Sequence, residues 1–175
     1  MKQARSPQKS PDGKLAELLA EHKQALTALT KSEERFRAMV TASSDVVYCM
    51  SPDWKEMRQL QGKEFIPDTD SPSSNWLDRY IDQDDQPQVL AVIKQAIRTK
   101  SIFQLEHRVR RVNGTLGWAF SSAVPLLDKR GQIVEWIGTA SDITAQKLAE
   151  AALRASEEKY RLLFESMNEG FAIIE

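Results

Sequence analysis

Few side chains in this sequence belong to the types that perform covalent or metal chemistry. The chain has one cysteine, Cys49, and two histidines, His22 and His107. Cys49 lies in the apolar run VVYCM, which predicts a strand. Two histidines do not make a dedicated zinc site without carboxylates or a partner chain, so we predict no metal site. His107 is expected on a strand, either as a hydrogen-bonded structural residue or as a contact to a ligand.

The sequence also lacks the residues that phosphotransfer and calcium binding require. Autophosphorylation requires an acceptor histidine in an acidic and proline context together with a nucleotide site, and the sequence Ala-Glu-His-Lys-Gln around His22 lacks that context. The acidic cluster at 82–85 lacks the central glycine and the closing glutamate of a calcium loop. Asp84 or Asp85 is instead expected to cap a helix at 86–99. We therefore expect no enzymatic activity from this chain.

The composition is typical of one ordinary domain with helical extensions. The 175 residues are 41% hydrophobic, and 24 basic side chains stand against 25 acidic ones for a net charge of -1. Because no positive field attracts phosphates, nucleic acid is not an expected partner. No apolar run reaches the roughly 18 to 20 residues that span a bilayer, and residues 1–13 lack the apolar core of a signal peptide. The single cysteine excludes an intrachain disulfide framework, so the expected location is cytoplasmic.

An amphipathic helix is predicted at 14–43, after a disordered tail at 1–13 that is rich in Lys, Gln, Ser and Pro. The apolar positions of this helix alternate in spacings of three and four, as in a short heptad pattern. The positions of the seam are Leu15, Leu18, His22, Ala25 and Leu29. Two structures fit the pattern: a parallel coiled coil in a homodimer, or a single helix that lies on its own domain.

The segment at 44–143 changes to strand periodicity and carries strong turn signals. VVYCM and MRQLQG are predicted to be paired strands, and WLDRYI gives one or two helical turns after a loop. Asn113 and Gly114 tolerate the positive φ angles of a tight hairpin turn, and the sequence DKRGQ forms a second hairpin. Three long antiparallel strands are therefore expected side by side.

Alternation sorts the side chains of these three strands into two faces. In the first strand one face carries Phe103, Leu105, His107 and Val109, and the other carries Glu106, Arg108 and Arg110. In the middle strand the two faces carry Ala119, Ser121 and Ala123 against Trp118, Phe120, Ser122 and Val124. In the last strand they carry Trp136, Gly138 and Ala140 against Ile137 and Thr139. Neither face of the last two strands is plainly polar, which predicts helices over one face and a terminal helix over the other.

Five motifs in this order resemble a PAS sensory domain with its C-terminal PAC motif. They are SEERFR, WLDRYIDQDD, LEHRVRRVNGTLGW, VEWIGTASDIT and AQKLAEAALRASEEKYRLLFE. The resemblance covers roughly 32–164. Asp142, Ile143 and Thr144, which lead into a charged helix, match the family's usual exit and would relay its signal. The resemblance implies an α/β (α+β) fold, in which a five-stranded antiparallel sheet has helices on one face and is flanked by N-terminal and C-terminal signalling helices.

The chain begins the same motif twice. The sequence SEERFRAMVTASSDVVY at 32–48 returns as SEEKYRLLFESMNEGFA at 156–172, 124 residues later. A repeat interval of domain size implies an array of similar units. We therefore expect a PAS domain at 44–143, a linker helix at 144–167 and, at 168–175, the first strand of a truncated second PAS domain.

Few cofactor residues carry over from the family. Flavin photosensors of the family present a reactive cysteine in a short helical motif, whereas Cys49 is expected in a strand, which argues against covalent flavin chemistry. Haem-binding members place their ligand histidine on the long helix, and residues 86–99 contain no histidine, which argues against haem. The cofactor is therefore left open.

The resemblance implies a pocket for a small molecule between the sheet and its helices. The candidate residues are His107, Val109, Ala119, Ser121, Ala123, Trp136 and Ala140. The short side chains of Ala119, Ser121, Ala123 and Ala140 leave room for a ligand above Trp136, or bulky helix residues such as Val89, Ile93 and Ile97 fill that room. The sequence departs from the family pattern between Asp53 and Trp76, in the segment that would form the pocket wall, so the resemblance does not identify the ligand.

Three functions are compatible with these features. The first is a sensory module that passes ligand or redox state to an effector domain in the same parent chain through the linker helix. The second is a ligand-free dimerisation spacer, and the third is the regulatory region of an enzyme such as a diguanylate cyclase. We expect the first, in a homodimeric bacterial sensor histidine kinase.

Overall fold

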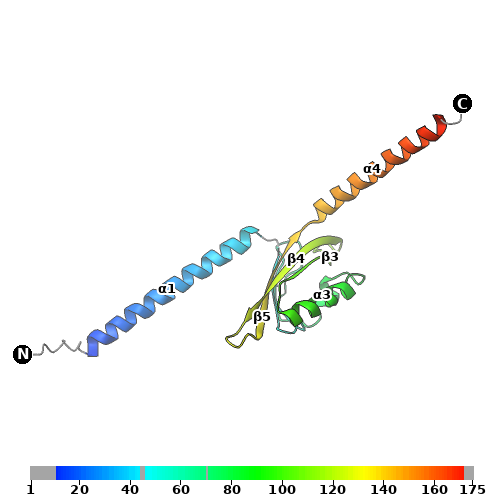
Figure 1. Ribbon diagram of the computed structural model, residues 1–175. Coiled ribbons are helices and arrows are strands. Elements are labelled where there is room, and N and C mark those ends of the chain that lie inside the picture. Colours follow the sequence, from blue (N-terminus) through cyan, green and yellow to red (C-terminus); the bar gives the residue numbers. More distant parts are fainter. Residues whose placement is uncertain (1–10, 44–45, 70, 172–175) are drawn as a thin grey trace, which may run out of the picture. The chain divides into compact units, whose positions relative to one another are not determined.

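The computed structural model describes residues 11–43, 46–69 and 71–171 (Figure 1). Residues 1–43 and 44–175 form two separate compact units. The first is the single helix α1 (Pro11–Ser43), which covers the predicted 14–43 and begins three residues earlier. The predicted tail at 1–13 otherwise lies outside the described residues. The three leucines of the predicted seam, Leu15, Leu18 and Leu29, are all more than half exposed.

The second unit is built on one antiparallel sheet of five strands. The strands are β1 (Val46–Met50), β2 (Met57–Gln61), β3 (Phe103–Arg110), β4 (Leu116–Leu127) and β5 (Ile133–Asp142). Their order across the sheet is β2-β1-β5-β4-β3, so the last three strands lie side by side as the sequence predicts. Both hairpin turns have the expected glycine geometry, with φ of 78° at Gly114 and 70° at Gly131.

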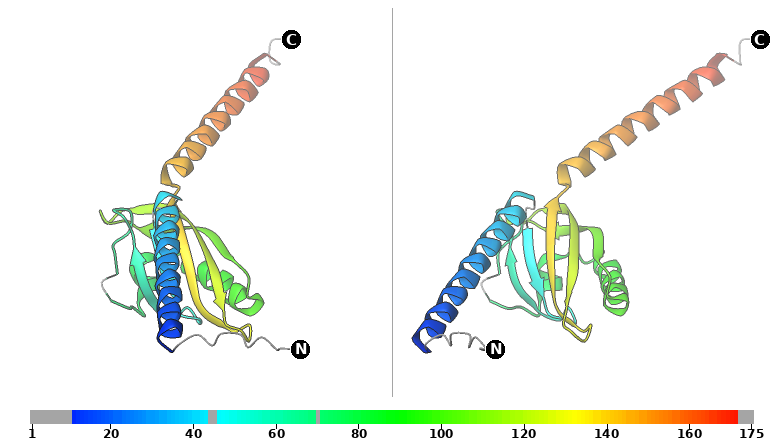
Figure 2. Two further views of the ribbon diagram at one scale, coloured as in Figure 1. Left: turned by 90° about the vertical axis from the view of Figure 1, so that its left-hand side faces the viewer. Right: turned by 60° about the vertical axis from the view of Figure 1, so that its left-hand side comes forward.

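Two helices cover one face of this sheet, which is called the inner face below. They are α2 (Trp76–Tyr80) and α3 (Gln86–Thr99), and Figure 2 shows α3 on one side of the strands. Helix α3 buries Val89, Ile93 and Ala96 because these positions fall on one stripe of the helix. On the outer face Phe120 and Val124 are 39% and 48% exposed, and its covering by a terminal helix stays a prediction.

The predicted capping of α3 is wrong in its mechanism. Asp85 occupies the N-cap position, but its side chain makes no cap hydrogen bond. Its carboxylate instead accepts hydrogen bonds from the backbone N–H of Arg108 at 2.6 Å and from the Arg108 guanidinium at 2.7 Å. A guanidinium partner across the fold makes stronger, charge-assisted bonds than a backbone N–H of the helix. The acidic cluster therefore fastens the start of α3 to strand β3.

A long helix, α4 (Thr144–Phe171), leaves the last strand directly. It contains the predicted linker helix at 144–167 and continues into the segment predicted as the first strand of a second domain. Residues 172–175 lie outside the described residues, so the second domain stays a prediction. Within the described ranges no helix is long and apolar enough to cross a membrane, and no group of three or more His, Cys, Asp or Glu is placed to hold a metal ion.

Candidate functional site

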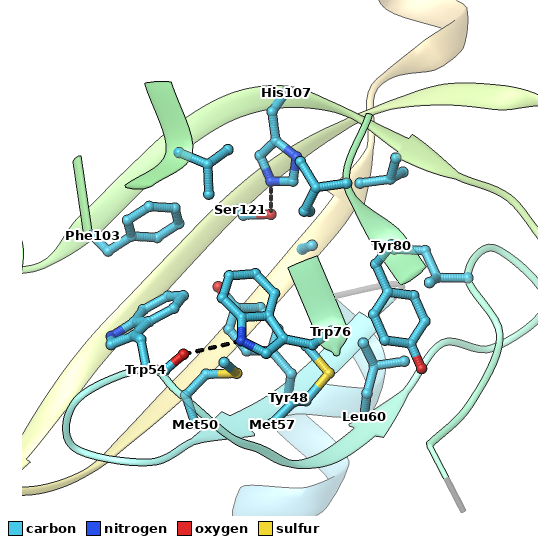
Figure 3. Close-up of a pocket in the computed structure, with 15 residues that line it drawn as sticks. Tyr48, Met50, Trp54, Met57, Leu60, Trp76, Tyr80, Phe103, His107 and Ser121 are labelled. Atoms are coloured by element: carbon cyan, nitrogen blue, oxygen red, sulfur yellow. Dashed lines mark hydrogen bonds between the residues drawn. The ribbon is translucent and has the colours of Figure 1, made fainter. Parts of the chain in front are cut away.

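A small cavity of about 40 Å³ lies between the inner face of the sheet and the covering segments (Figure 3). Apolar side chains make most of its wall. The lining residues are Tyr48, Met50, Trp54, Met57, Leu60, Ile66, Trp76, Tyr80, Ile81, Val89, Phe103, His107, Val109, Ser121 and Ala140. None of these described lining residues is a lysine, arginine, aspartate or glutamate.

His107 and Ser121 form the polar part of the cavity wall. The His107 Nε2 atom and the Ser121 Oγ atom are 2.9 Å apart, across the β3–β4 pairing, and each residue is only 5% exposed. The other ring nitrogen, Nδ1, is buried and has no hydrogen-bond partner among the described residues. Burial lowers the pKa of His107, although the Arg108 backbone and the Asp85 carboxylate oppose the shift. The ring is therefore neutral at pH 7, and one buried nitrogen lacks a partner.

The aromatic part of the wall is centred on Trp54, which the turn between β1 and β2 inserts into the core. Trp54 has φ of 58°, a left-handed backbone that a bulky residue rarely adopts. Its ring centroid lies 4.9 Å from that of Phe103, 5.6 Å from Trp136 and 6.0 Å from Trp76. The Trp76 indole N–H also donates to the Trp54 carbonyl at 3.0 Å. These contacts outweigh the backbone strain and fill much of the space above the sheet.

The predicted pocket residues separate into two groups. Four of them line the cavity: His107, Val109, Ser121 and Ala140. The other three, Ala119, Ala123 and Trp136, are fully buried in the core without lining it. Sequence reasoning missed Trp54, Trp76 and Phe103, although two tryptophans at the ends of a polar, turn-rich segment are themselves a sign of a buried anchor.

Three hydrogen bonds hold the exit residues, one to Asp142 at the end of strand β5 and two to Trp118 of strand β4. The backbone N–H of Thr144 donates to Asp142 Oδ1 at 2.8 Å, and Thr144 Oγ1 accepts from the backbone N–H of Trp118 at 2.9 Å. The backbone N–H of Ile143 donates to the Trp118 carbonyl at 2.9 Å. The first residue of α4 is thus held by strand β4 as well as by strand β5.

Three consecutive residues of β3 contact three different parts of the domain. His107 lines the cavity, as described above. On the outer face Glu106 forms an ion pair at 2.6 Å with Lys147 of α4, whose ammonium group also lies over the Trp118 ring. Arg108 pairs with Asp82 and Asp85 before α3, and its hydrogen bonds lower the pKa of Asp85. His107 therefore lies between one residue that contacts the linker helix and one that contacts the residues before α3.

Comparison with known proteins gives a family for this architecture. The profile of the PAS fold matches residues 49–140. Over 92 residues the chain is 35% identical to the peroxide stress-activated histidine kinase mak1 of Schizosaccharomyces pombe, a match that covers 49% of the chain and 6% of that protein. The chain thus spans only a small part of this curated relative.

Solved structures give the same assignment. A sensory box histidine kinase/response regulator from Burkholderia thailandensis is 26% identical, with a TM-score of 0.59 over 73% of this chain and 98% of that one. The N-terminal domain of a diguanylate cyclase with a PAS/PAC sensor from Marinobacter aquaeolei shares the fold at 15% identity, with a TM-score of 0.51 over 58% of this chain and 97% of that one.

The five-stranded sheet, its helices over one face and the helix that leaves its last strand define an α+β sensor-type domain. The chain belongs to the PAS fold family. The fungal relative and the Burkholderia structure are histidine kinases by their names.

Proposed function

We propose that this chain is a sensory and signal-relay module, which passes the state of its cavity to an effector domain of the same parent protein through α4. One observation carries the proposal. Ala140 lines the cavity, and two residues further along β5 the Asp142 carboxylate accepts the hydrogen bond from the first residue of α4. A displacement of β5 at the cavity therefore reaches the linker helix within one strand step of about 7 Å.

A sensor histidine kinase is the proposed parent protein. The fungal relative and the Burkholderia relative both carry that activity in their names, and the exit triplet Asp142, Ile143 and Thr144 fits a PAC-type exit into a linker helix. A diguanylate cyclase is the alternative parent, since the Marinobacter relative has that name. In the proposed parent protein the effector domain would follow α4. In a homodimer the two linker helices would lie together.

A ligand-free dimerisation spacer is the second candidate function, and the packing of Trp54 favours it. The indole already occupies the centre of the aromatic cluster, and the remaining cavity of about 40 Å³ is small beside the ~150 Å³ of a cavity that takes up benzene. In a spacer, α4 would transmit force between neighbouring domains, and the cavity would have no part in it.

An engineered cavity separates the two functions. Trp54→Ala should cost about 3 to 5 kcal/mol and leave an indole-shaped space, and Trp54→Leu is a milder second variant that keeps part of the packing. Added indole should then raise the melting temperature of the variants and leave that of the unmodified chain unchanged. Amide hydrogen exchange across residues 145–153 reports on the linker.

A relay predicts that indole alters exchange at 145–153 in the Trp54 variants but not in the unmodified chain. A spacer predicts that indole restores the melting temperature while exchange in the linker stays as it was. A restored melting temperature without a change in linker exchange, in a variant that binds indole, would contradict the proposed relay.

A further inference from the structure

The segment 62–68, which follows β2, has a strained backbone and contributes to the wall of the cavity. Lys63 and Glu64 have φ of 43° and 70°, so two consecutive residues that are not glycine adopt the left-handed conformation. The next two residues, Phe65 and Ile66, are 6% and 4% exposed, and Ile66 lines the cavity. Because strain of this kind persists only where surrounding contacts hold it, the contacts of Phe65 and Ile66 fix the position of the segment.

The turn between β3 and β4 holds Phe65. The Arg111 guanidinium lies over the Phe65 ring, with its Cζ atom 5.7 Å from the ring centroid, and the Val112 backbone N–H donates to the Phe65 carbonyl at 3.2 Å. The backbone of Arg111 is itself fixed in the turn, since its N–H donates to the Thr115 carbonyl at 2.8 Å and its carbonyl accepts from the Gly114 N–H at 2.9 Å. The segment is therefore attached to a hydrogen-bonded turn.

The guanidinium of Arg111 also reaches the exit of the domain. Its Nη2 atom lies 3.6 Å from Asp142 Oδ2, and Asp142 Oδ1 accepts the 2.8 Å hydrogen bond from the N–H of Thr144, the first residue of α4. The stem of this side chain passes close to Gly117, where an added Cβ atom would come within 2.7 Å of the Arg111 Cδ atom. One side chain thus contacts both the strained segment and the carboxylate that binds the start of the linker helix.

We propose that Arg111 is a positioning residue that couples the segment 62–68 to α4, by a route that does not use Ala140 of β5. A displacement of Ile66 at the cavity moves Phe65, the ring moves the guanidinium, and the guanidinium moves the Asp142 carboxylate. This rests on the proposed relay function, to which it adds a second input. The coupling is modest, because the side chains of Arg111 and Asp142 are 34% and 27% exposed and water screens their attraction.

Amide hydrogen exchange of the whole chain tests this coupling. Phe65→Leu removes the ring under the guanidinium, and exchange at 145–153 should rise by about two- to threefold relative to that of the β4 amides, which report opening of the whole domain. In the Arg111→Gln background the same change should leave exchange at 145–153 as it is, because the charge that contacts both partners is already gone. A merely structural role of Phe65 would give the same effect in both backgrounds.

Phe103→Leu is the matched control, since it shortens another buried phenylalanine of the cavity wall, at the opposite end of β3. Its effect on exchange at 145–153 should be the same with and without Arg111→Gln. Phe65→Met, which also lacks the aromatic ring, is a second variant if Phe65→Leu does not fold.

Two outcomes overturn the proposal. One is a change of linker exchange on loss of the Phe65 ring that is equally large in both backgrounds, and the other is no change in the chain that keeps Arg111. Either outcome leaves the relay through β5 testable, because the indole experiment on Trp54→Ala does not depend on Arg111.

Discussion

The ring of Tyr48 lies directly on the backbone of Gly138, the residue opposite it on the neighbouring strand. A Cβ atom added to Gly138 would come within 2.2 Å of the ring carbon Cζ of Tyr48. Tyr48 is 6% exposed and borders only the small cavity, so little room is left into which its ring could move. The missing side chain at position 138 thus allows an aromatic ring to form part of the cavity wall.

Gly138→Ala should therefore destabilise the domain by about 1 to 3 kcal/mol, the usual cost of overpacking a core. Urea unfolding of the variant measures the loss. In the double variant with Tyr48→Leu, the alanine should cost clearly less than it does in the presence of the ring. Equal costs in the two backgrounds would show that the Tyr48 ring is not what opposes a side chain at this position.

The strands of this fold follow from local pattern, whereas the cavity does not. Alternation in FQLEHRVR and the Asn113-Gly114 turn predicted β3, β4 and their faces, because period and turn chemistry are properties of neighbouring residues. The position of Trp54 depends on a left-handed residue and on contacts to Phe103 and Trp136, far away in the sequence. For the same reason the pairing of Asp85 with Arg108 replaced the cap that the local sequence predicted.

The ion pair between Glu106 and Lys147 is expected to steady the first turns of α4. Glu106→Gln removes the charge that holds the ammonium group at 2.6 Å, and amide exchange at 145–153 should rise by about twofold, since the pair is partly exposed. Glu150→Gln, which removes the more distant 3.7 Å partner of Lys147, is the control and should change less. The charge swap Glu106→Lys with Lys147→Glu should return exchange towards its original rate, and a swap that fails to do so counts against this pair.

The hydrogen bonds at the exit should hold the linker more firmly than this ion pair does. Asp142→Ala combined with Thr144→Ala removes the acceptor at 2.8 Å and the hydroxyl that binds the Trp118 N–H. Two lost hydrogen bonds should cost about 1 to 2 kcal/mol, which is roughly a 5- to 30-fold rise in local opening at 145–153, while β3 and β4 stay protected. Thr144→Ser keeps the hydroxyl and serves as control. Unchanged exchange in the double variant would show that these side chains do not hold α4.

Protonation of His107 should make the domain less stable at mildly acidic pH. Burial lowers the pKa of His107 below its ordinary value of 6.5, so in this range the unfolded chain binds more protons than the folded one. The free energy of unfolding should therefore fall as the pH drops from 7.5 through 6.5 to 5.5. Asp85 faces the same strand, but its pKa is lowered from 3.8, so it loses its stabilising effect only at still lower pH.

Urea unfolding at pH 7.5 and pH 5.5 checks this dependence. His107→Phe should flatten this pH dependence, although the variant has its own stability at pH 7.5. If the unmodified chain and His107→Phe lose stability equally between the two pH values, the titrating group lies elsewhere.

The predicted seam of α1 is tested by the mass of the chain in solution. If Leu15, Leu18, His22, Ala25 and Leu29 form the core of a parallel coiled coil, His22 places a polar ring at a position that favours an apolar side chain. His22→Leu should then tighten the dimer by about tenfold or more, because a leucine side chain buried at the seam contributes ~1.5 to 3 kcal/mol. Leu18→Glu should dissociate it, because two carboxylates would face each other across the seam.

Sedimentation equilibrium of the unmodified chain, His22→Leu and Leu18→Glu gives the dissociation constant of each dimer. Glu21→Gln, next to His22 but outside the seam, is the matched control and should change the dissociation constant little. Since α1 forms its own compact unit, the circular dichroism and the melting curve of each whole variant chain can show that the second unit still folds. If all four proteins then have the same mass over the same concentration range, α1 is not the dimer interface. Any association of the chain would in that case belong to the sheet or to α4, whose Leu153, Tyr160 and Leu163 are likewise exposed at spacings close to a heptad.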